Sequence, residues 1–307
     1  MKRLVIFVAL LAICGGALYY SHRHKTAAHV GPEAVLNVLA ETQRDLSRVP
    51  AKLTRLSDDE EIRIGDDMAA GYLGRLGGTR NPQDNKPKDD KTNTAENAAA
   101  ALTEKMQLYV SDVGRAVAAH ARRKLPYRFH YVPDPNFINA FALPGGHVFI
   151  GGGLIHLMET EDQLASVLGH EVEHIDNYHC AERVQIEAIA RQIPLGGLVA
   201  LPIEIFQAGY SKEQELEADR DGASLAVTAG YSAQGAIHMF QTFAQLHKKY
   251  VLKSGAPDEE MSKVAIEGIM GYFRSHPLPE EREAQIKRIM AANDWPALRE
   301  RPIRQKP

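Results

Sequence analysis

Residues 161–178 limit what this chain can fold into more than any other stretch of its sequence. Apolar side chains recur there at helical spacing and predict a helix with one buried face: Leu164, Val167, Leu168, Val172 and Ile175. The pattern His-Glu-x-x-His is embedded in the same helix, at residues 170–174. The fold must therefore bury a helix that also carries two histidines and a glutamate.

The two histidines of this pattern predict a metal site. His170 and His174 are four residues apart, so on a helix their Cβ atoms lie on one face, about 5 to 6 Å apart. Two imidazoles so arranged can bind one cation. Burying two imidazoles costs free energy unless each nitrogen finds a partner. We therefore favour a metal site over two core histidines bonded only to the backbone. Glu171 lies beside them, where a carboxylate can act as general base on a water held by the metal.

A catalytic zinc site needs a third protein ligand and an open position for water. One known pattern places a third histidine six residues after the second, but that position here is Cys180. His179 is one residue short of it. We expect His179 to cap the helix or to bond within the fold.

An acidic helix predicted for residues 211–229 offers better candidates for the third ligand. Ser211 is a typical N-cap for it, and glutamates follow at every second position, so that at most one or two can face a metal. Glu215 and Asp219 are four residues apart and share a face. Glu215 would bind the ion, and Asp219 would accept a hydrogen bond from the non-ligating nitrogen of a histidine. Glu217 is the rival ligand.

The rest of the sequence predicts a mostly helical α+β domain. Residues 127–132 alternate in a way that suits a strand, and residues 140–150 read as strand, turn and strand. The segment 147–150 is a candidate sheet edge with which an extended substrate could pair, or else an ordinary core strand. A last helix is expected over residues 280–292.

Composition divides the chain into four parts. Residues 1–27 predict a membrane anchor or signal segment, and residues 28–76 predict lead-in helices of the following domain. Residues 77–97 contain no large apolar side chain, so we expect a polar mobile insertion over 77–101. The catalytic domain would then occupy residues 102–307.

The N-terminal segment is expected to enter a membrane. Residues 4–20 carry no charge and follow two basic residues. An uncleaved anchor is favoured over a cleaved signal because the apolar run is long and basic residues follow it. Ile13 stands where a lipoprotein signal needs a small residue before Cys14, so a lipid-anchored form is disfavoured. A secreted form would require the cleaved signal and is disfavoured for that reason. The balance of basic residues favours a catalytic domain on the periplasmic side.

The overall charge excludes one class of partner. The formal net charge is −3, from 36 basic and 39 acidic residues, so the chain has no basic footprint for a nucleic acid. The partners we expect are protein or peptide substrates, and a membrane through the N-terminal segment. The oligomeric state does not follow from the sequence.

Four motifs occur in a fixed order along the chain: NAFALPGG at 139–146, EDQLA at 161–165 leading into HEVEH at 170–174, ELEAD at 215–219, and HPLPEER at 276–282. Their order and spacing resemble the HtpX-like and BepA-like zinc metallopeptidases, which are related to the CaaX prenyl proteases and the mitochondrial Oma-type protease. The resemblance covers roughly residues 58–289. A single hydrophobic segment is more similar to the periplasmic BepA-like and Oma-like branch.

The resemblance implies a zincin-like domain with a small β-sheet edge beside the active-site helix. It implies one Zn²⁺ per chain, with His170, His174 and Glu215 as ligands and Glu171 as the base, and it supports Glu215 over Glu217. His276 could stabilise the developing oxyanion, or could occupy the fourth metal position in a latent state.

The sequence therefore predicts a membrane-tethered zinc endopeptidase in the quality control of misfolded or envelope proteins. A metal-activated water would attack the peptide carbonyl, with Glu171 as general base. The alternative is a zinc-stabilised chaperone or scaffold of the cell envelope with little turnover. Only the enzyme predicts that Glu171→Gln retains the metal and abolishes cleavage.

Overall fold

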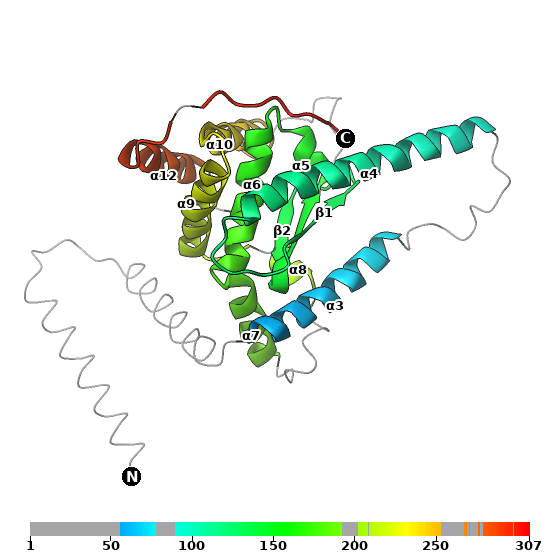
Figure 1. Ribbon diagram of the computed structural model, residues 1–307, viewed down its shortest axis with the longest axis horizontal. Helices are drawn as coiled ribbons and strands as arrows, with labels where there is room; N and C mark the ends of the chain where they lie inside the picture. The colour runs from blue at the N-terminus through cyan, green and yellow to red at the C-terminus, as the bar shows by residue number, and fades with distance from the viewer. Residues whose placement is uncertain are drawn as a thin grey trace, which may run out of the picture. The chain divides into compact units, whose positions relative to one another are not determined.

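The computed structural model describes residues 56–77, 90–191, 202–207, 209–252, 267–268, 270, 276, 279–296 and 298–307. All of them belong to one compact unit, Ala51–Pro307. Helices pack against a three-stranded sheet, which confirms the mostly helical α+β class (Figure 1). The predicted N-terminal membrane segment lies outside the described residues, and within them no helix is long and apolar enough to span a bilayer.

The sheet contains β1 (Arg128–Val132), β2 (Ala140–Leu143) and β3 (His147–Gly151) in the order β1-β3-β2. β3 pairs in parallel with β1 and antiparallel with β2. Of the two alternatives for residues 147–150, the ordinary core strand is therefore confirmed and the sheet edge is wrong. Every residue of β3 is buried, and a continuous apolar run is typical of a strand with neighbours on both sides. The sheet edge beside the active-site helix is β2, which contacts that helix.

The turn between β2 and β3 is fixed by the glycines of the NAFALPGG motif. Gly145 has a φ of 75°, and a Cβ there would lie 2.5 Å from the Cα of Ile62 in helix α3 (Asp58–Gly77). The amide of Gly145 donates to the carboxylate of Glu61, at 3.2 Å. Arg123 forms an ion pair with the same buried carboxylate, at 2.5 Å. This turn therefore joins the sheet to α3.

The remaining helices carry or support the candidate site. They are α4 (Asp90–Ala118), α5 (Gly152–His156), α6 (Glu161–Asp176), α7 (His179–Ala190), α8 (Glu204–Gln207), α9 (Lys212–Thr228), α10 (Gln234–Leu246) and α12 (Pro279–Ala292), with π-helical residues His247–Leu252 after α10. α4 begins inside the insertion predicted over 77–101. Residues 98–101 are four alanines, the strongest helix formers, so the helix extends further toward the N-terminus than we expected.

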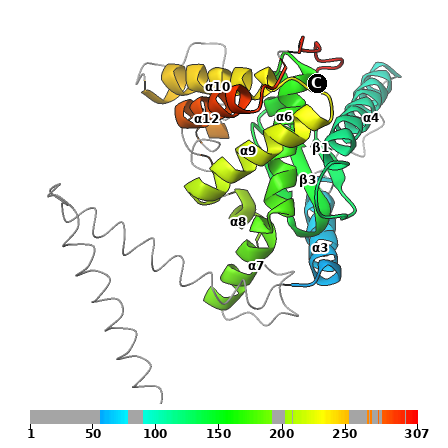
Figure 2. The ribbon, with the colours of Figure 1, turned by 60° about the vertical axis from the view of Figure 1, so that its left-hand side comes forward.

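α6 is the central helix of the fold. It begins with a capping box between Thr160 and Gln163, and nearly all its residues are buried. Its most extensive packing is against α9, which begins with a second capping box between Ser211 and Gln214 (Figure 2). The two helices meet at glycines: a Cβ on Gly169 would lie 2.6 Å from the carbonyl oxygen of Gly222. This close approach brings the histidines of α6 next to the acids of α9.

Candidate metal centre

His170 and His174 from α6 and Glu215 from α9 converge on one point. The Nε2 atoms of His170 and His174 are 3.1 Å apart. Nε2 of His170 lies 3.5 Å from Glu215 Oε2, and Nε2 of His174 lies 3.6 Å from Glu215 Oε1. Ligand atoms around a tetrahedral zinc ion with bonds of about 2.1 Å are about 3.4 Å apart. The three side chains therefore have the separations of three zinc ligands. Within the described ranges they form the only such cluster of three.

The burial of the cluster also fits a bound cation. The side chains of His174 and Glu215 are fully buried. Among the described residues, Glu215 Oε1 finds no hydrogen-bond partner, and a buried carboxylate oxygen without a partner is costly. A cation held by two imidazole nitrogens and one carboxylate would satisfy that oxygen. This donor set is one that catalytic zinc sites use.

The electrostatics of the cluster suit this role. Burial lowers the pKa of His174 well below its usual value, and positive charge on His170 adds to the effect, so the imidazole is neutral. Burial alone would raise the pKa of Glu215, but His276 and His170 hold it well below its usual value. Burial alone would lower the pKa of His170, but hydrogen bonds to Asp219 and Glu215 raise it to about 10. A cation would have to displace that proton.

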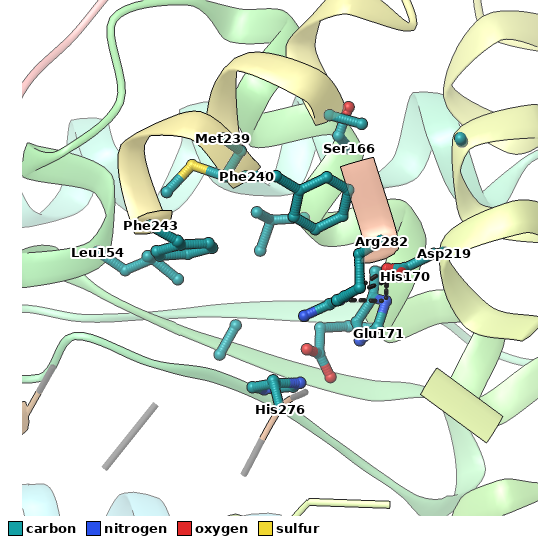
Figure 3. Close-up of a pocket in the computed structure, with 14 residues that line it drawn as sticks. Leu154, Ser166, His170, Glu171, Asp219, Met239, Phe240, Phe243, His276 and Arg282 are labelled. Atoms are coloured by element: carbon teal, nitrogen blue, oxygen red, sulfur yellow. Dashed lines mark hydrogen bonds and ion pairs between the residues drawn. The ribbon is translucent and has the colours of Figure 1, made fainter. Parts of the chain in front are cut away.

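His170 is oriented by a carboxylate on its far side. Its Nδ1 lies 2.9 Å from Asp219 Oδ1, so an Nδ1–H donated to Asp219 leaves the lone pair of Nε2 for a metal. Asp219 is in turn held by Arg282 of α12, whose Nε and Nη2 donate to its two carboxylate oxygens at 2.7 and 2.6 Å. Figure 3 shows these contacts among the residues that line the pocket, next to Glu171. Arg282 therefore bridges α12 and α9.

His174 is oriented by a second chain of contacts. Its Nδ1 lies 3.0 Å from Nδ1 of His179, and Nε2 of His179 lies 3.4 Å from the carboxylate of Glu217. If Nε2 of His174 faces a metal, its Nδ1–H donates to His179, whose own Nε2–H points to Glu217. Glu217, the rival third ligand, thus contacts His179 and lies outside the ligand cluster. The ring of Tyr210 stacks on His174 at 4.0 Å.

Sequence reasoning did not identify His179 and Tyr210 as part of the site. α6 ends at Asp176, and Tyr178 has a left-handed φ of 64° before α7 begins at His179. That turn points the His179 ring back to His174, which helical periodicity cannot predict. A histidine five residues after His174 was the available signal. Tyr210 directly precedes the Ser211 cap and carries no comparable signal.

Glu171 and His276 complete the site on the side away from Asp219. Glu171 is 3% exposed, and burial raises its pKa to about 7. His276 is buried, and its Nδ1 lies 2.7 Å from Glu215 Oε2. Figure 3 shows the Glu171 carboxylate pointing toward His276 at the end of a pocket. The six residues singled out from the sequence as catalytic, metal-binding or supporting therefore come together: His170, Glu171, His174, Glu215, Asp219 and His276.

Comparison with known proteins agrees with this geometry. The model for peptidase family M48 matches residues 104–290, more than half of the chain. The putative β-barrel assembly-enhancing protease of Vibrio cholerae is 30% identical over 214 residues, which cover 62% of this chain and 40% of that protein. The β-barrel assembly-enhancing protease of Escherichia coli is 27% identical over 202 residues, covering 58% and 38%. The mitochondrial metalloendopeptidase OMA1 of Schizosaccharomyces pombe is 28% identical over 214 residues, covering 62% and 58%. The chain spans less than two thirds of the length of each relative.

Proposed function

The chain belongs to peptidase family M48, and on that basis we propose that it is a zinc-dependent endopeptidase. The observation that carries the proposal is the cluster of His170, His174 and Glu215 with Glu171 beside it at the end of a pocket. The names of the relatives, which are proteases and a metalloendopeptidase, support the same activity.

The residues of the site divide the work of peptide hydrolysis between them. Zinc bound by the three ligands would activate a water molecule and polarise the substrate carbonyl. Glu171 would act as general base toward that water and as general acid toward the leaving amine, and its place beside the ligands at the end of the pocket suits both roles. Asp219 and His179 hold the imidazoles of His170 and His174 in place, so the site is preorganised.

His276 is proposed to act on the open side of the site. Its position beside Glu215 supports either of two roles: stabilising the oxyanion that develops on the substrate, or occupying the fourth metal position in a latent state. The two roles predict opposite effects of removing the imidazole.

The cellular setting that we propose is a membrane-tethered enzyme with its catalytic domain on the periplasmic side. The uncharged N-terminal run of residues 4–20 supports the tether. The names of the bacterial relatives connect those proteins with β-barrel assembly, so misfolded or misassembled envelope proteins are the substrates we expect.

The direct test compares the full chain in detergent with its Glu171→Gln variant, measuring casein hydrolysis and zinc content side by side. We expect about one zinc ion in both proteins and cleavage by the parent alone. Zinc in both without cleavage in either would favour a zinc-stabilised chaperone or scaffold. Absence of zinc from both would overturn the ligand assignment.

A further inference from the structure

The buried side chain of Arg123 joins helix α3 to the end of α6. It belongs to the loop between α4 and β1. On one side its guanidinium pairs with the carboxylates of Asp58 and Glu61 of α3, at 2.6 and 2.5 Å. On the other side its Nη1 donates to the carbonyl oxygen of Ile175, in the last turn of α6, at 2.8 Å. A planar guanidinium can make these forked contacts together, whereas the single nitrogen of a lysine cannot.

The same guanidinium covers the turn that follows α6. Its central carbon lies 3.9 Å from the centre of the Tyr178 ring. Tyr178 has a left-handed φ of 64°, which a bulky residue adopts only where its surroundings enforce it. The amide of Tyr178 donates to the carbonyl oxygen of Ile175 at 3.0 Å, so the turn and the guanidinium share one acceptor. Arg123 therefore holds the turn against the end of α6.

The direction of this turn decides where the next side chain points. His179 follows directly, and its Nδ1 lies 3.0 Å from Nδ1 of His174. A hydrogen bond weakens steeply when its length or angle departs from the preferred geometry. A change of the backbone at Tyr178 would therefore loosen the contact that orients His174.

Helix α3 is held in a close-fitting place of its own. A Cβ on Gly65 would lie only 1.8 Å from the carbonyl oxygen of Pro144, in the turn between β2 and β3. The amide of Gly145 in that turn donates to Glu61, the carboxylate that also pairs with Arg123. A displacement of α3 from this turn would thus move the partner of Arg123.

We propose that α3 sets the geometry of the metal site through Arg123 and Tyr178. The two side chains are positioning residues, because they hold His179 in the orientation that its contact with His174 requires. The inference rests on the ligand assignment of the proposed function. It makes α3 a point of regulation, since moving this helix would weaken zinc binding without touching a ligand.

The first test removes the ring beneath the guanidinium. Zinc affinity of the full chain in detergent is measured by competition with a chelator. Tyr178→Gly permits the left-handed turn but no longer enforces it, and it should raise the zinc dissociation constant about tenfold. Tyr178→Phe keeps a ring under the guanidinium and should retain the affinity of the parent. Equal affinities of the folded glycine variant and the parent would overturn the proposal.

The second test weakens the guanidinium contacts and keeps the charge. Arg123→Lys should also raise the zinc dissociation constant about tenfold. The matched control is Arg304→Lys at the other end of α6. Arg304 likewise pairs with a buried glutamate, Glu161, at 2.5 Å and lies over a ring, that of Tyr109, at 4.9 Å. The control should leave zinc affinity unchanged, and an equal loss in both variants would contradict a specific role of Arg123.

The third test moves α3 itself. Gly65→Ala must push the helix away from the turn between β2 and β3, because the carbonyl oxygen of Pro144 occupies the Cβ position. Gly71→Ala is the same substitution in the same helix, with no described atom within 4 Å of its Cβ position. We expect weaker zinc binding from the first substitution only. Equal zinc affinity of the two folded variants would overturn the role of α3.

The His179→Ala background separates positioning from general stability. The substitutions at Tyr178, Arg123 and Gly65 are each repeated in it. None should weaken zinc binding further, because each acts through the imidazole that is already absent. A further loss of the same size would show that the effect bypasses His179, and it would overturn the proposal.

Zinc affinity distinguishes this inference from the peptidase activity. If the parent binds zinc and does not cleave casein, the activity is overturned, and the affinities of the variants still decide the inference. If the parent cleaves casein and the substitutions leave zinc affinity unchanged, only the inference is overturned. A parent that binds no zinc would overturn both.

Discussion

The Nδ1 atoms of His174 and His179 lie 3.0 Å apart, although α6 has already ended between them. The contact continues to Glu217, at 3.4 Å from the other nitrogen of His179. His179 is 4% exposed, so water does not replace it easily. It is therefore a positioning residue for His174, comparable to Asp219 for His170.

Removing the His179 imidazole should weaken metal binding. His179→Ala leaves Nδ1 of His174 without its partner, and loss of such partners typically lowers metal affinity about 10- to 100-fold. Zinc affinity is measured by competition with a chelator. The matched control is His156→Ala, because His156 is exposed at the end of α5. Equal zinc affinity of the two variants would contradict the role of His179.

Gly222→Ala should separate the two helices that carry the ligands. A Cβ at Gly222 would lie 2.6 Å from the backbone nitrogen of His170, so α9 must move and carry Glu215 with it. We expect a loss of about 1–3 kcal/mol in the free energy of unfolding, together with weaker zinc binding. Gly71→Ala in α3 is the control, because no described atom lies within 4 Å of its Cβ position. That substitution should stabilise the protein by about 0.5–1 kcal/mol without changing zinc affinity.

Arg282→Ala should destabilise the fold strongly. It leaves Asp219 as a buried carboxylate without its ion-pair partner, which typically costs about 3–5 kcal/mol. The control is Arg191→Ala, which removes an exposed pair with Glu187 and should cost about 0.3–0.5 kcal/mol. Urea unfolding measures both. A small effect of Arg282→Ala would show that Asp219 can be satisfied without the guanidinium.

His276→Ala should reveal which of its two roles operates. Loss of casein hydrolysis with zinc retained would indicate oxyanion stabilisation, since the imidazole then acts on the substrate. Increased hydrolysis would indicate latency, since the fourth position would be freed. Unchanged hydrolysis and unchanged zinc affinity would sink both roles.

The stability of the fold should fall below pH 6.5 because of His130. Burial, together with the charges of His147 and Arg128, lowers the pKa of His130 from 6.5 to about 4. Between these two pKa values the unfolded chain binds a proton that the folded chain does not, so stability decreases as the pH falls. The pKa of His147, which bonds to Asp66, is also lowered by burial.

The size of the effect follows from the linkage of protonation to folding. From pH 7 to pH 5, His130 should account for a loss of about 1–2 kcal/mol in the free energy of unfolding. Urea unfolding at the two pH values, compared with His130→Gln, isolates this contribution from other titrating groups. The same pH slope in parent and variant would contradict it.

The sequence was most informative where the physics is local. Helical spacing alone placed His170, Glu171 and His174 together, and the predicted strand, turn and strand over 140–150 were found. Prediction from the sequence failed where the structure depends on pairing between distant segments. Nothing in residues 147–150 distinguishes a central strand from an edge, because the distinction depends on β1 lying alongside β3.

The order of four motifs was sufficient to predict the family. Residue spacing on single helices was sufficient to predict the candidate ligands, because side-chain direction on a helix follows from its 3.6-residue turn. The convergence of those ligands was decided by the tertiary structure. α6 and α9 approach closely because Gly169 and Gly222 have no Cβ, and the turn at Tyr178 brings His179 back beside His174. Contacts of this kind depend on how two elements cross, which no local pattern in either element records.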